Sequence, residues 1–182
     1  MKKALDRSGI LKKNIEIKSL VNYFEDTRWS MDFQFNEVQE LSHCMTLYQA
    51  NKNSYLMLEG EVEEAYLCFI LKGSVKIQMK NPNEEGIKSV TPTLSERTLN
   101  IVGPGNIIGE ISFLDNSPRS ASVIATEPVL FLVFDEDNFD WLIRKNPVLS
   151  VKVMRKISTT VCHRLRQSNN QLINMMTTHD SI

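Results

Sequence analysis

The sequence predicts a mainly β protein: an eight-stranded, jelly-roll-like β-roll with helices before it, one short helix inside it and a long helix after it. Three observations lead to this fold class. Between residues 46 and 134, short apolar and β-branched runs alternate with Gly, Pro and Asn, which is typical of strands joined by turns. Before this region, apolar residues recur at helical spacing. After it, Pro147 stands where proline best opens a helix.

The first 32 residues are expected to be a helical extension. Residues 11–26 are predicted to form an amphipathic helix, whose apolar positions are Leu11, Ile15, Leu20, Val21 and Phe24. A second helix is predicted around residues 36–44, where Val38 and Leu41 continue a helical spacing. The domain that follows is expected to begin at residue 33, and so to include this second helix.

Residues 33–146 are expected to form the β-roll domain. Its strands are predicted within short runs that turn formers separate, namely YLMLEG, EAYLCFILKG, SVKIQMKNPNEEG, IKSV, RTLNIVGPG, SASVIATEP and VLFLVF. An elaborated loop is expected over residues 81–97, which are polar and include two prolines. After the last strand, Asp135 is placed to cap a helix over residues 138–146, because a carboxylate there accepts a hydrogen bond from a free backbone amide.

Residues 147–182 are predicted to be a long helix and a short tail. The helix is expected from about Pro147 to Met176, a length of roughly 45 Å at 1.5 Å per residue. Residues 148–157 are expected to pack on the roll. The helix also carries a seam with alternating spacings of four and three residues, made of Met154, Ser158, Val161, Leu165, Ser168, Leu172 and Met175. A homodimer in which two copies of this helix pair is the simplest way to cover the seam.

The composition excludes several classes of protein. No stretch reaches the roughly 18 apolar residues of a membrane span, and the charged N-terminus lacks the apolar run of a signal peptide. Three separated cysteines fit free thiols in a reducing compartment better than a disulfide framework or a zinc site, so a cytoplasmic protein is expected. From Trp141 to His179 the chain has seven basic residues and no acidic one, which could attract an anionic ligand, a phosphate-rich partner or an acidic surface.

Residues 99–125 carry the candidate chemistry. Gly109 can adopt a backbone conformation that other residues avoid, or allow a ligand to approach closely. Residues 111–114 can form one helical turn whose free amides would face an anion. Arg119 follows nine residues after Glu110, and a guanidinium aimed at such a turn suits a phosphate. Glu110 would repel a bare phosphate but accepts a hydrogen bond from a sugar hydroxyl, so the pair predicts a nucleotide ligand.

Two segments, GEISFL at residues 109–114 and PRSASV at residues 118–123, resemble the phosphate-binding cassette of cyclic-nucleotide-binding domains. That family includes catabolite-activator-type regulators, protein kinase A regulatory subunits and cyclic-nucleotide-gated channels. The similarity extends over about residues 33–168 and takes in Gly60, the FILKGSV turn and the GPG turn. It implies a β-roll that binds cAMP or cGMP, and a C-terminal helix that closes over the base as a lid.

The resemblance also implies roles for the residues around the phosphate and the sugar. Glu110 would hold the ribose 2′-hydroxyl, and Arg119 would hold the cyclic phosphate. The backbone amides from Gly109 to Ser112 would cap the phosphate, assisted by the hydroxyl of Ser120. Because a hydroxyl at this last position suits either the phosphate or a guanine, cAMP and cGMP both stay open.

Around the base, the resemblance makes Leu99 and Val102 an apolar wall. Ser168 and Asn169 would reach the purine edge from the dimer seam. The complete set of expected ligand-binding residues is Leu99, Val102, Gly109, Glu110, Ile111, Ser112, Arg119, Ser120, Ala121, Ser168 and Asn169.

Enzymatic activity is not expected. Cupins, which are also small β-rolls, hold a metal with histidines on their strands, whereas the predicted strands here contain no histidine. No catalytic nucleophile, metal site or resident cofactor is predicted. Direct DNA binding is not expected either, because only residues 177–182 follow the long helix, where related transcription factors add a helix-turn-helix.

Two functions remain after these exclusions. The leading one is a stand-alone receptor for cAMP or cGMP, which relays ligand binding through its C-terminal helix to a second protomer or an effector protein. The alternative is a nucleotide-free protein-interaction module on the same fold, in which Glu110 and Arg119 form a structural ion pair.

Overall fold

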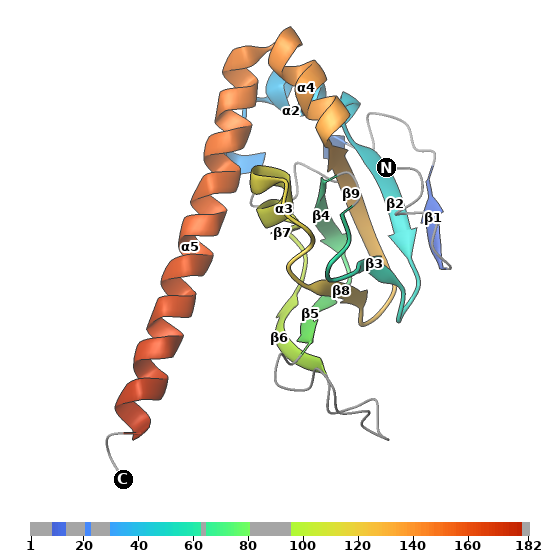
Figure 1. Cartoon of the computed structure of the whole chain (residues 1–182). Coiled ribbons are helices and arrows are strands. Elements are labelled where there is room, and N and C mark those ends of the chain that lie inside the picture. Colours follow the sequence, from blue (N-terminus) through green and yellow to red (C-terminus); the bar gives the residue numbers. More distant parts are fainter. Residues whose placement is uncertain (1–8, 14–20, 23–29, 63–64, 81–95, 180–182) are drawn as a thin grey trace. The chain divides into compact units, whose positions relative to one another are not determined.

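Figure 1 shows the whole chain in the structure, a computed structural model. The chain forms two compact units, Met1–Trp141 and Leu142–Ile182. The described residues are 9–13, 21–22, 30–62, 65–80 and 96–179. All strands of the described residues lie in the first unit. The second unit consists of the end of one helix and the whole of the long one.

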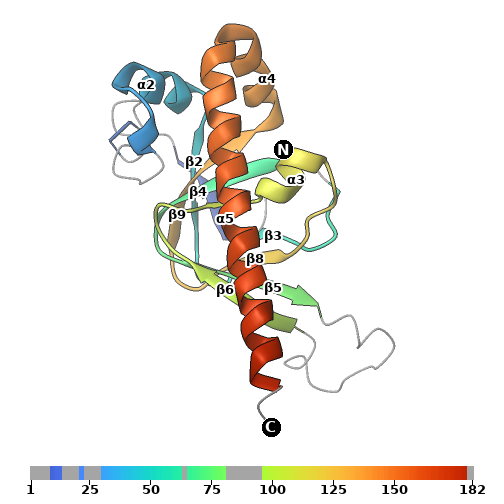
Figure 2. The same ribbon diagram turned by 90° about the vertical axis from the view of Figure 1, so that its left-hand side faces the viewer.

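The described strands form two antiparallel sheets. The first sheet has the order β1-β2-β9-β4-β7, with the bounds Ile10–Lys12, Thr46–Ala50, Val129–Asp135, Tyr66–Lys72 and Ile107–Ile108. The second has the order β3-β8-β5-β6, with the bounds Tyr55–Met57, Ser122–Ala125, Val75–Lys80 and Glu96–Val102. In Figure 2 the strands of this second sheet lie together in the lower part of the roll.

Four α-helices and a 3₁₀ turn are described in full. They are η1 (Ser30–Asp32), α2 (Phe35–His43), α3 (Glu110–Asp115), α4 (Glu136–Lys145) and α5 (Pro147–His179). Asp135 precedes α4, and its Oδ1 accepts a hydrogen bond from the backbone N of Asn138 at 2.8 Å, as expected for an N-cap. Asn146 precedes α5, and its Oδ1 accepts from the backbone N of Leu149 at 3.1 Å.

The core of the roll lies between the two sheets. Every one of the nine described strands contributes at least one buried side chain to a single apolar cluster, from Ile10 on β1 to Val133 on β9. Along β5, Val75 and Ile77 face this cluster, as the two-residue period of a strand requires. Both sheets supply side chains to this cluster, so the inner face of each sheet is buried by packing against the other sheet.

The N-terminal extension differs from its prediction. Leu11 and Lys12 were expected in a helix, but they belong to β1, which pairs with β2 in the register Ile10 to Ala50 and Lys12 to Tyr48. The reason lies in tertiary contacts, because Ile10 is 7% exposed and joins the core cluster. Strand pairing with β2 and burial in the core therefore outweigh the local helical preference that the apolar spacing indicated. Val21 and Asn22 are helical, and the rest of the predicted helix over 14–26 lies outside the described residues.

The remaining elements agree with the predicted fold class, a β-roll with flanking helices. The helix predicted around 36–44 is α2, and the long helix continues to His179 rather than Met176. Eight strands, β2 to β9, make up the described roll, and β1 adds a ninth. The short strands β2 and β7 were not among the predicted runs, and the IKSV run with most of the loop over 81–97 lies outside the described residues.

The second unit is dominated by α5, a helix of 33 residues. Near its start Leu149, Val153 and Ile157 are buried and stand four residues apart. Farther along, Leu165 and Leu172 are exposed by more than half. None of the helices in the described part of the chain combines the length and the apolar character needed to cross a membrane.

Candidate ligand-binding site

Gly109 forms the turn before α3, and the geometry there requires glycine. Its φ is +84°, in the left-handed region that L side chains avoid. A Cβ atom on Gly109 would lie 2.6 Å from the carbonyl oxygen of Tyr66 and 3.0 Å from Nη1 of Arg119. The backbone at Gly109 is therefore packed directly against β4 and the Arg119 side chain.

The guanidinium of Arg119 lies beside this turn, and the residue is only 5% exposed. Its Nη1 donates to the carbonyl oxygens of Tyr66, at 3.2 Å, and of Gly109, at 3.3 Å. Its Cζ lies 4.3 Å from the centre of the Tyr66 ring, a cation–π distance. Its Nη2 is buried and has no hydrogen-bond partner. Since a buried charged donor without an acceptor is unfavourable, this geometry favours an anionic ligand at Nη2.

The backbone of Arg119 is also held on both sides. Its N donates to the carbonyl oxygen of Glu61 at 2.9 Å, and its carbonyl oxygen accepts from the N of Gly60 at 2.8 Å. Oε2 of Glu61 in turn accepts from the backbone N of Leu58 at 3.1 Å. The turn over residues 58–61 therefore fixes the backbone from which the guanidinium extends.

The positive charge of Arg119 acts on the core of the roll as well. Burial raises the pKa of the Cys68 thiol to about 12, and the guanidinium of Arg119 opposes this rise because it favours the thiolate. Cys68 is on β4, two residues after Tyr66, and is fully buried. The charged group of the candidate site thus lies close to the apolar interior rather than on the surface.

The other residues of the cassette differ in burial. Glu110 and Ser112, in the first turn of α3, are each 4% exposed. Ile111 is 44% exposed, Ser120 is exposed and Ala121 is half-buried. The carboxylate expected to meet a sugar is therefore held inside the fold, directly after the glycine that Arg119 contacts.

The two residues expected to wall a base have different surroundings. Val102, on β6, is 6% exposed and belongs to the core cluster. Leu99 is 57% exposed and stands at a β-bulge, where the register between β5 and β6 shifts between Ile77 and Gln78. A bulge changes the direction of the side chain next to it. Of the two residues predicted to form the apolar wall, Val102 is therefore buried in the core, whereas Leu99 is exposed.

Two residues of this region were not singled out from the sequence. Tyr66 is 1% exposed, lies against the guanidinium of Arg119 and donates from its hydroxyl to the carbonyl oxygen of Leu56 at 2.6 Å. Ile77 packs against the core cluster and pairs with Val123. Both stand in apolar strand runs. No sequence pattern separates an aromatic residue that stacks on arginine from one that only fills a core.

Ser168 and Asn169, expected at the purine edge, lie on α5 in the second compact unit. Both are exposed and stand between the exposed Leu165 and Leu172. Their contact with a ligand stays a prediction, as does the packing of residues 148–157 on the roll.

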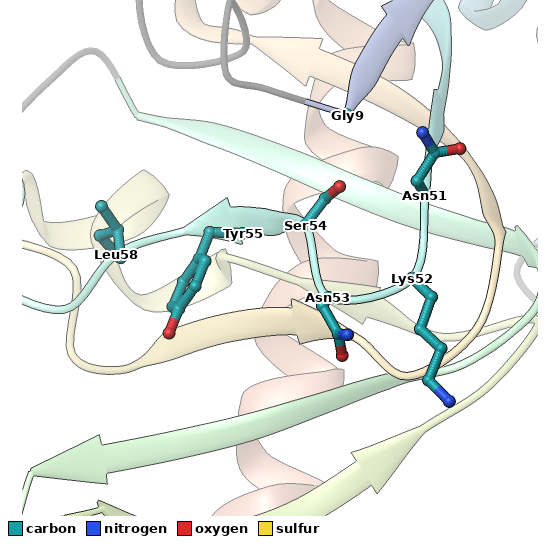
Figure 3. A pocket seen from close by; sticks show the side chains of 7 residues that line it. All are labelled: Gly9, Asn51, Lys52, Asn53, Ser54, Tyr55 and Leu58. Carbon is teal, nitrogen blue, oxygen red and sulfur yellow. The ribbon is translucent and has the colours of Figure 1, made fainter. Parts of the chain in front are cut away.

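A separate hollow lies at the turn between β2 and β3 (Figure 3). It has a volume of about 610 Å³ and is lined by Gly9, Asn51, Lys52, Asn53, Ser54, Tyr55 and Leu58. Figure 3 shows the side chains of Asn51 and Lys52 pointing away from one another, so the polar groups do not converge. The hollow shares no residue with the predicted ligand set. Over the described ranges, no group of three or more His, Cys, Asp or Glu side chains is placed to hold a metal ion.

The fold and this site define a ligand-binding β-roll with a cationic hydrogen-bond donor inside it. The family model described as "Cyclic nucleotide-binding domain" matches residues 48–146, more than half of the chain. The chain belongs to this cyclic-nucleotide-binding family. The resemblance drawn from the cassette residues and the predicted fold class are both confirmed.

Several known proteins share this domain. The CRP-like cAMP-activated global transcriptional regulator of Mycobacterium tuberculosis is 30% identical over 120 residues, which are 66% of this chain and 47% of the regulator. The cyclic AMP receptor protein of Thermus thermophilus is 36% identical over 77 residues, 42% of this chain and 34% of the receptor. The crystal structure of a cyclic nucleotide-binding domain from Methylobacillus flagellatus has a TM-score of 0.77 and 26% identity, and the match covers 95% of this chain and 94% of that one. The chain spans between a third and a half of the length of these two curated relatives.

Proposed function

We propose that this chain is a receptor for cAMP or cGMP and that it binds the cyclic phosphate at Arg119. The observation that carries the proposal is the buried Nη2 of Arg119, which has no hydrogen-bond partner while Nη1 donates to two carbonyl oxygens. A phosphate oxygen supplies the missing acceptor, and a charge-assisted hydrogen bond is about twice as strong as a neutral one. The amides of Ile111 and Ser112, at the start of α3, have no acceptor within that helix and are proposed as further donors.

Glu110 favours a nucleotide over inorganic phosphate. Its carboxylate is 4% exposed and follows Gly109, whose carbonyl oxygen accepts from Nη1 of Arg119. A carboxylate accepts hydrogen bonds and repels a phosphate, so it suits a ribose 2′-hydroxyl beside the phosphate. Ser120 is exposed and leaves both purines open.

A structural ion pair between Arg119 and Glu110, as in a module that has lost its ligand, explains the observed contacts of the Arg119 guanidinium less well. The guanidinium donates to the main chain at Tyr66 and Gly109 and stacks on an aromatic ring. A carboxylate acceptor at Nη2 would have satisfied the donor that is left unpaired.

A nucleoside without a phosphate is the natural comparison ligand. The regulatory subunit of a cAMP-independent protein kinase A from Trypanosoma cruzi, solved with guanosine, shares this fold at a TM-score of 0.61 and 17% identity. Here the free donor on Arg119 favours a ligand that retains its phosphate.

We infer that binding is relayed through α5 to a second copy of the chain or to an effector protein. A ligand shifts an equilibrium only through its different affinities for two states. In the proposed relay, the state with higher affinity places α5 over the base, where Ser168 and Asn169 would meet it. The exposed Leu165 and Leu172 are an apolar surface suited to pairing with a second copy. The chain itself is proposed to bind rather than to catalyse, although the acetyltransferase Pat of Mycolicibacterium smegmatis is 36% identical over 77 residues, 20% of that enzyme.

Isothermal titration calorimetry with cAMP, cGMP and guanosine tests the proposal. We expect binding at micromolar concentration or tighter for at least one cyclic nucleotide, and weaker binding of the nucleoside. Arg119→Ala should lose on the order of 1.5–3 kcal/mol of binding free energy, the value of a hydrogen bond to a charged group. Lys52→Ala, which removes an exposed cation at the separate hollow, is the matched control and should bind as the unaltered protein does.

The alternative is a nucleotide-free interaction module. The exposed apolar residues and the excess of basic residues on α5 favour it, because such a surface can dock another protein without a ligand. Absence of heat with both cyclic nucleotides, from folded protein free of co-purified ligand, would support this alternative. Arg119→Ala would then leave partner binding unchanged.

A further inference from the structure

We propose that Tyr66 is the positioning residue of this site: its ring and its own main-chain carbonyl orient the Arg119 guanidinium so that Nη2 is left for the ligand. The inference rests on the proposed function for the identity of the ligand. The orientation of Arg119 by Tyr66, in contrast, is a property of the protein alone and can be measured without any nucleotide.

Tyr66 is itself fixed at both ends. It is the first residue of β4, it is 1% exposed, and it belongs to the core cluster between the two sheets. Its hydroxyl donates to the carbonyl oxygen of Leu56 at 2.6 Å, so the far end of the side chain is held against the segment that forms β3. An aromatic ring with a packed body and a bonded tip is a rigid surface.

Arg119 rests on this surface through two separate contacts. Its Cζ lies 4.3 Å from the ring centre, and its Nη1 donates to the carbonyl oxygen of the same residue at 3.2 Å. The second acceptor of Nη1, the carbonyl oxygen of Gly109, is 3.3 Å away. One face of the planar guanidinium and one of its amino groups are therefore occupied, whereas Nη2 is buried without a partner.

The ring has a physical role that a packed aliphatic side chain would not fill. A guanidinium at 5% exposure has lost most of its hydration, and an aromatic face compensates it electrostatically, whereas an aliphatic surface does not. Without the ring, the two carbonyl acceptors of Nη1 would still constrain the guanidinium, but its face would be unsupported. Arginine side chains have large rotamer entropy, so an unsupported guanidinium would have to be ordered by the ligand itself.

Two substitutions at Tyr66 test the contribution of the aromatic ring separately from that of the hydroxyl. Tyr66→Phe keeps the aromatic face and removes the hydroxyl that donates to Leu56, whereas Tyr66→Leu removes the face and keeps an apolar side chain. Tyr48→Leu is the matched control, because Tyr48 is 8% exposed, belongs to the same core cluster and stacks on Phe131 with 5.9 Å between ring centres. Thermal unfolding of each variant establishes that it is folded.

The first measurement is the side-chain Nε–Hε NMR resonance of Arg119 in ligand-free protein, assigned by its loss in Arg119→Lys. A guanidinium over a ring is shifted upfield by the ring current, so we expect this signal to be shifted in the unaltered protein, in Tyr66→Phe and in Tyr48→Leu. In Tyr66→Leu the signal should move downfield, because the ring-current shift is lost. A signal that Tyr66→Leu leaves unmoved would overturn the proposal, whatever the ligand proves to be.

The second measurement is the dissociation constant of cAMP and of cGMP for the same variants. Loss of a desolvated cation–π contact predicts binding weaker by roughly 3- to 30-fold in Tyr66→Leu. Tyr66→Phe and Tyr48→Leu should stay within about threefold of the unaltered protein. Equal losses in the Phe and Leu variants, or no loss in either, would overturn the role of the ring. If the unaltered protein binds neither nucleotide, the proposed function fails, while the NMR measurement still decides the role of Tyr66.

Discussion

Replacing Gly109 with alanine should destabilise the roll by about 2–5 kcal/mol. The first contribution is conformational, because a φ of +84° costs a non-glycine residue about 1–2 kcal/mol. The second is steric: the added Cβ would lie 2.6 Å from both Cε of Met57 and the carbonyl oxygen of Tyr66. The methionine methyl can move aside, but the carbonyl belongs to β4 and cannot move without disturbing the sheet. Overpacking of this kind costs about 1–3 kcal/mol.

Gly60→Ala is a matched control for the steric contribution. Gly60 has a φ of +81°, close to that of Gly109, but no atom lies within 4 Å of the position its Cβ would take. This variant should lose only the conformational part, about 1–2 kcal/mol. Urea unfolding followed by circular dichroism gives both losses in the free energy of unfolding, and their difference isolates the collision with Tyr66. Equal losses in the two variants would refute the reasoning, because they would show that the close approach of the added Cβ atom to Tyr66 costs no free energy of unfolding.

Two other predictions concern the buried thiol of β4 and the exposed seam of α5. Burial raises the pKa of Cys68 from 9.0 to about 12, so above pH 9 the unfolded chain releases a proton that the folded chain keeps, and stability should fall as pH rises towards 12. The fall should approach about 1.4 kcal/mol per pH unit in urea titrations, and a Cys68→Ala variant with the same slope would contradict it. Replacing both Leu165 and Leu172, each more than half exposed, with aspartate should convert a dimer to a monomer. Light scattering measures this, and a dimer that persists with an unchanged fold would mean that its interface lies elsewhere.

The parts of the molecule that the sequence predicts well are those with local causes. Alternation of apolar residues between turn formers predicted the runs that contain β4, β5 and β9. The spacing of Gly109, Glu110 and Arg119 singled out one segment, and the structure brings the glycine and the arginine into contact. Each of these signals is contained in a few neighbouring residues, so no knowledge of distant parts of the chain is needed.

The parts that were missed depend on contacts between distant segments. Ile10 is in a strand because it pairs with Ala50 and enters the core, and the helical spacing around it carries no sign of that partner. Leu99 is exposed at a bulge, which depends on the register of two strands rather than on either sequence. Tyr66 contacts Arg119 across 53 residues of chain, so its role becomes visible only once both have been placed.

The position of β9 in the first sheet has a consequence for how the protein forms. β9 is the last of the described strands along the chain, yet it lies between β2 and β4, with Thr46 opposite Val133 and Cys68 opposite the same residue on its other side. A chain emerging from the ribosome therefore carries β2 and β4 with open edges until residue 135 has left the exit tunnel. Open edges recruit strands from other chains, so this interval is the time of greatest exposure to aggregation. A translational pause before β9 has left the tunnel, including one shortly after β9 is synthesised, should prolong the interval in which β2 and β4 lack their shared neighbour β9. A pause after β9 has emerged should not.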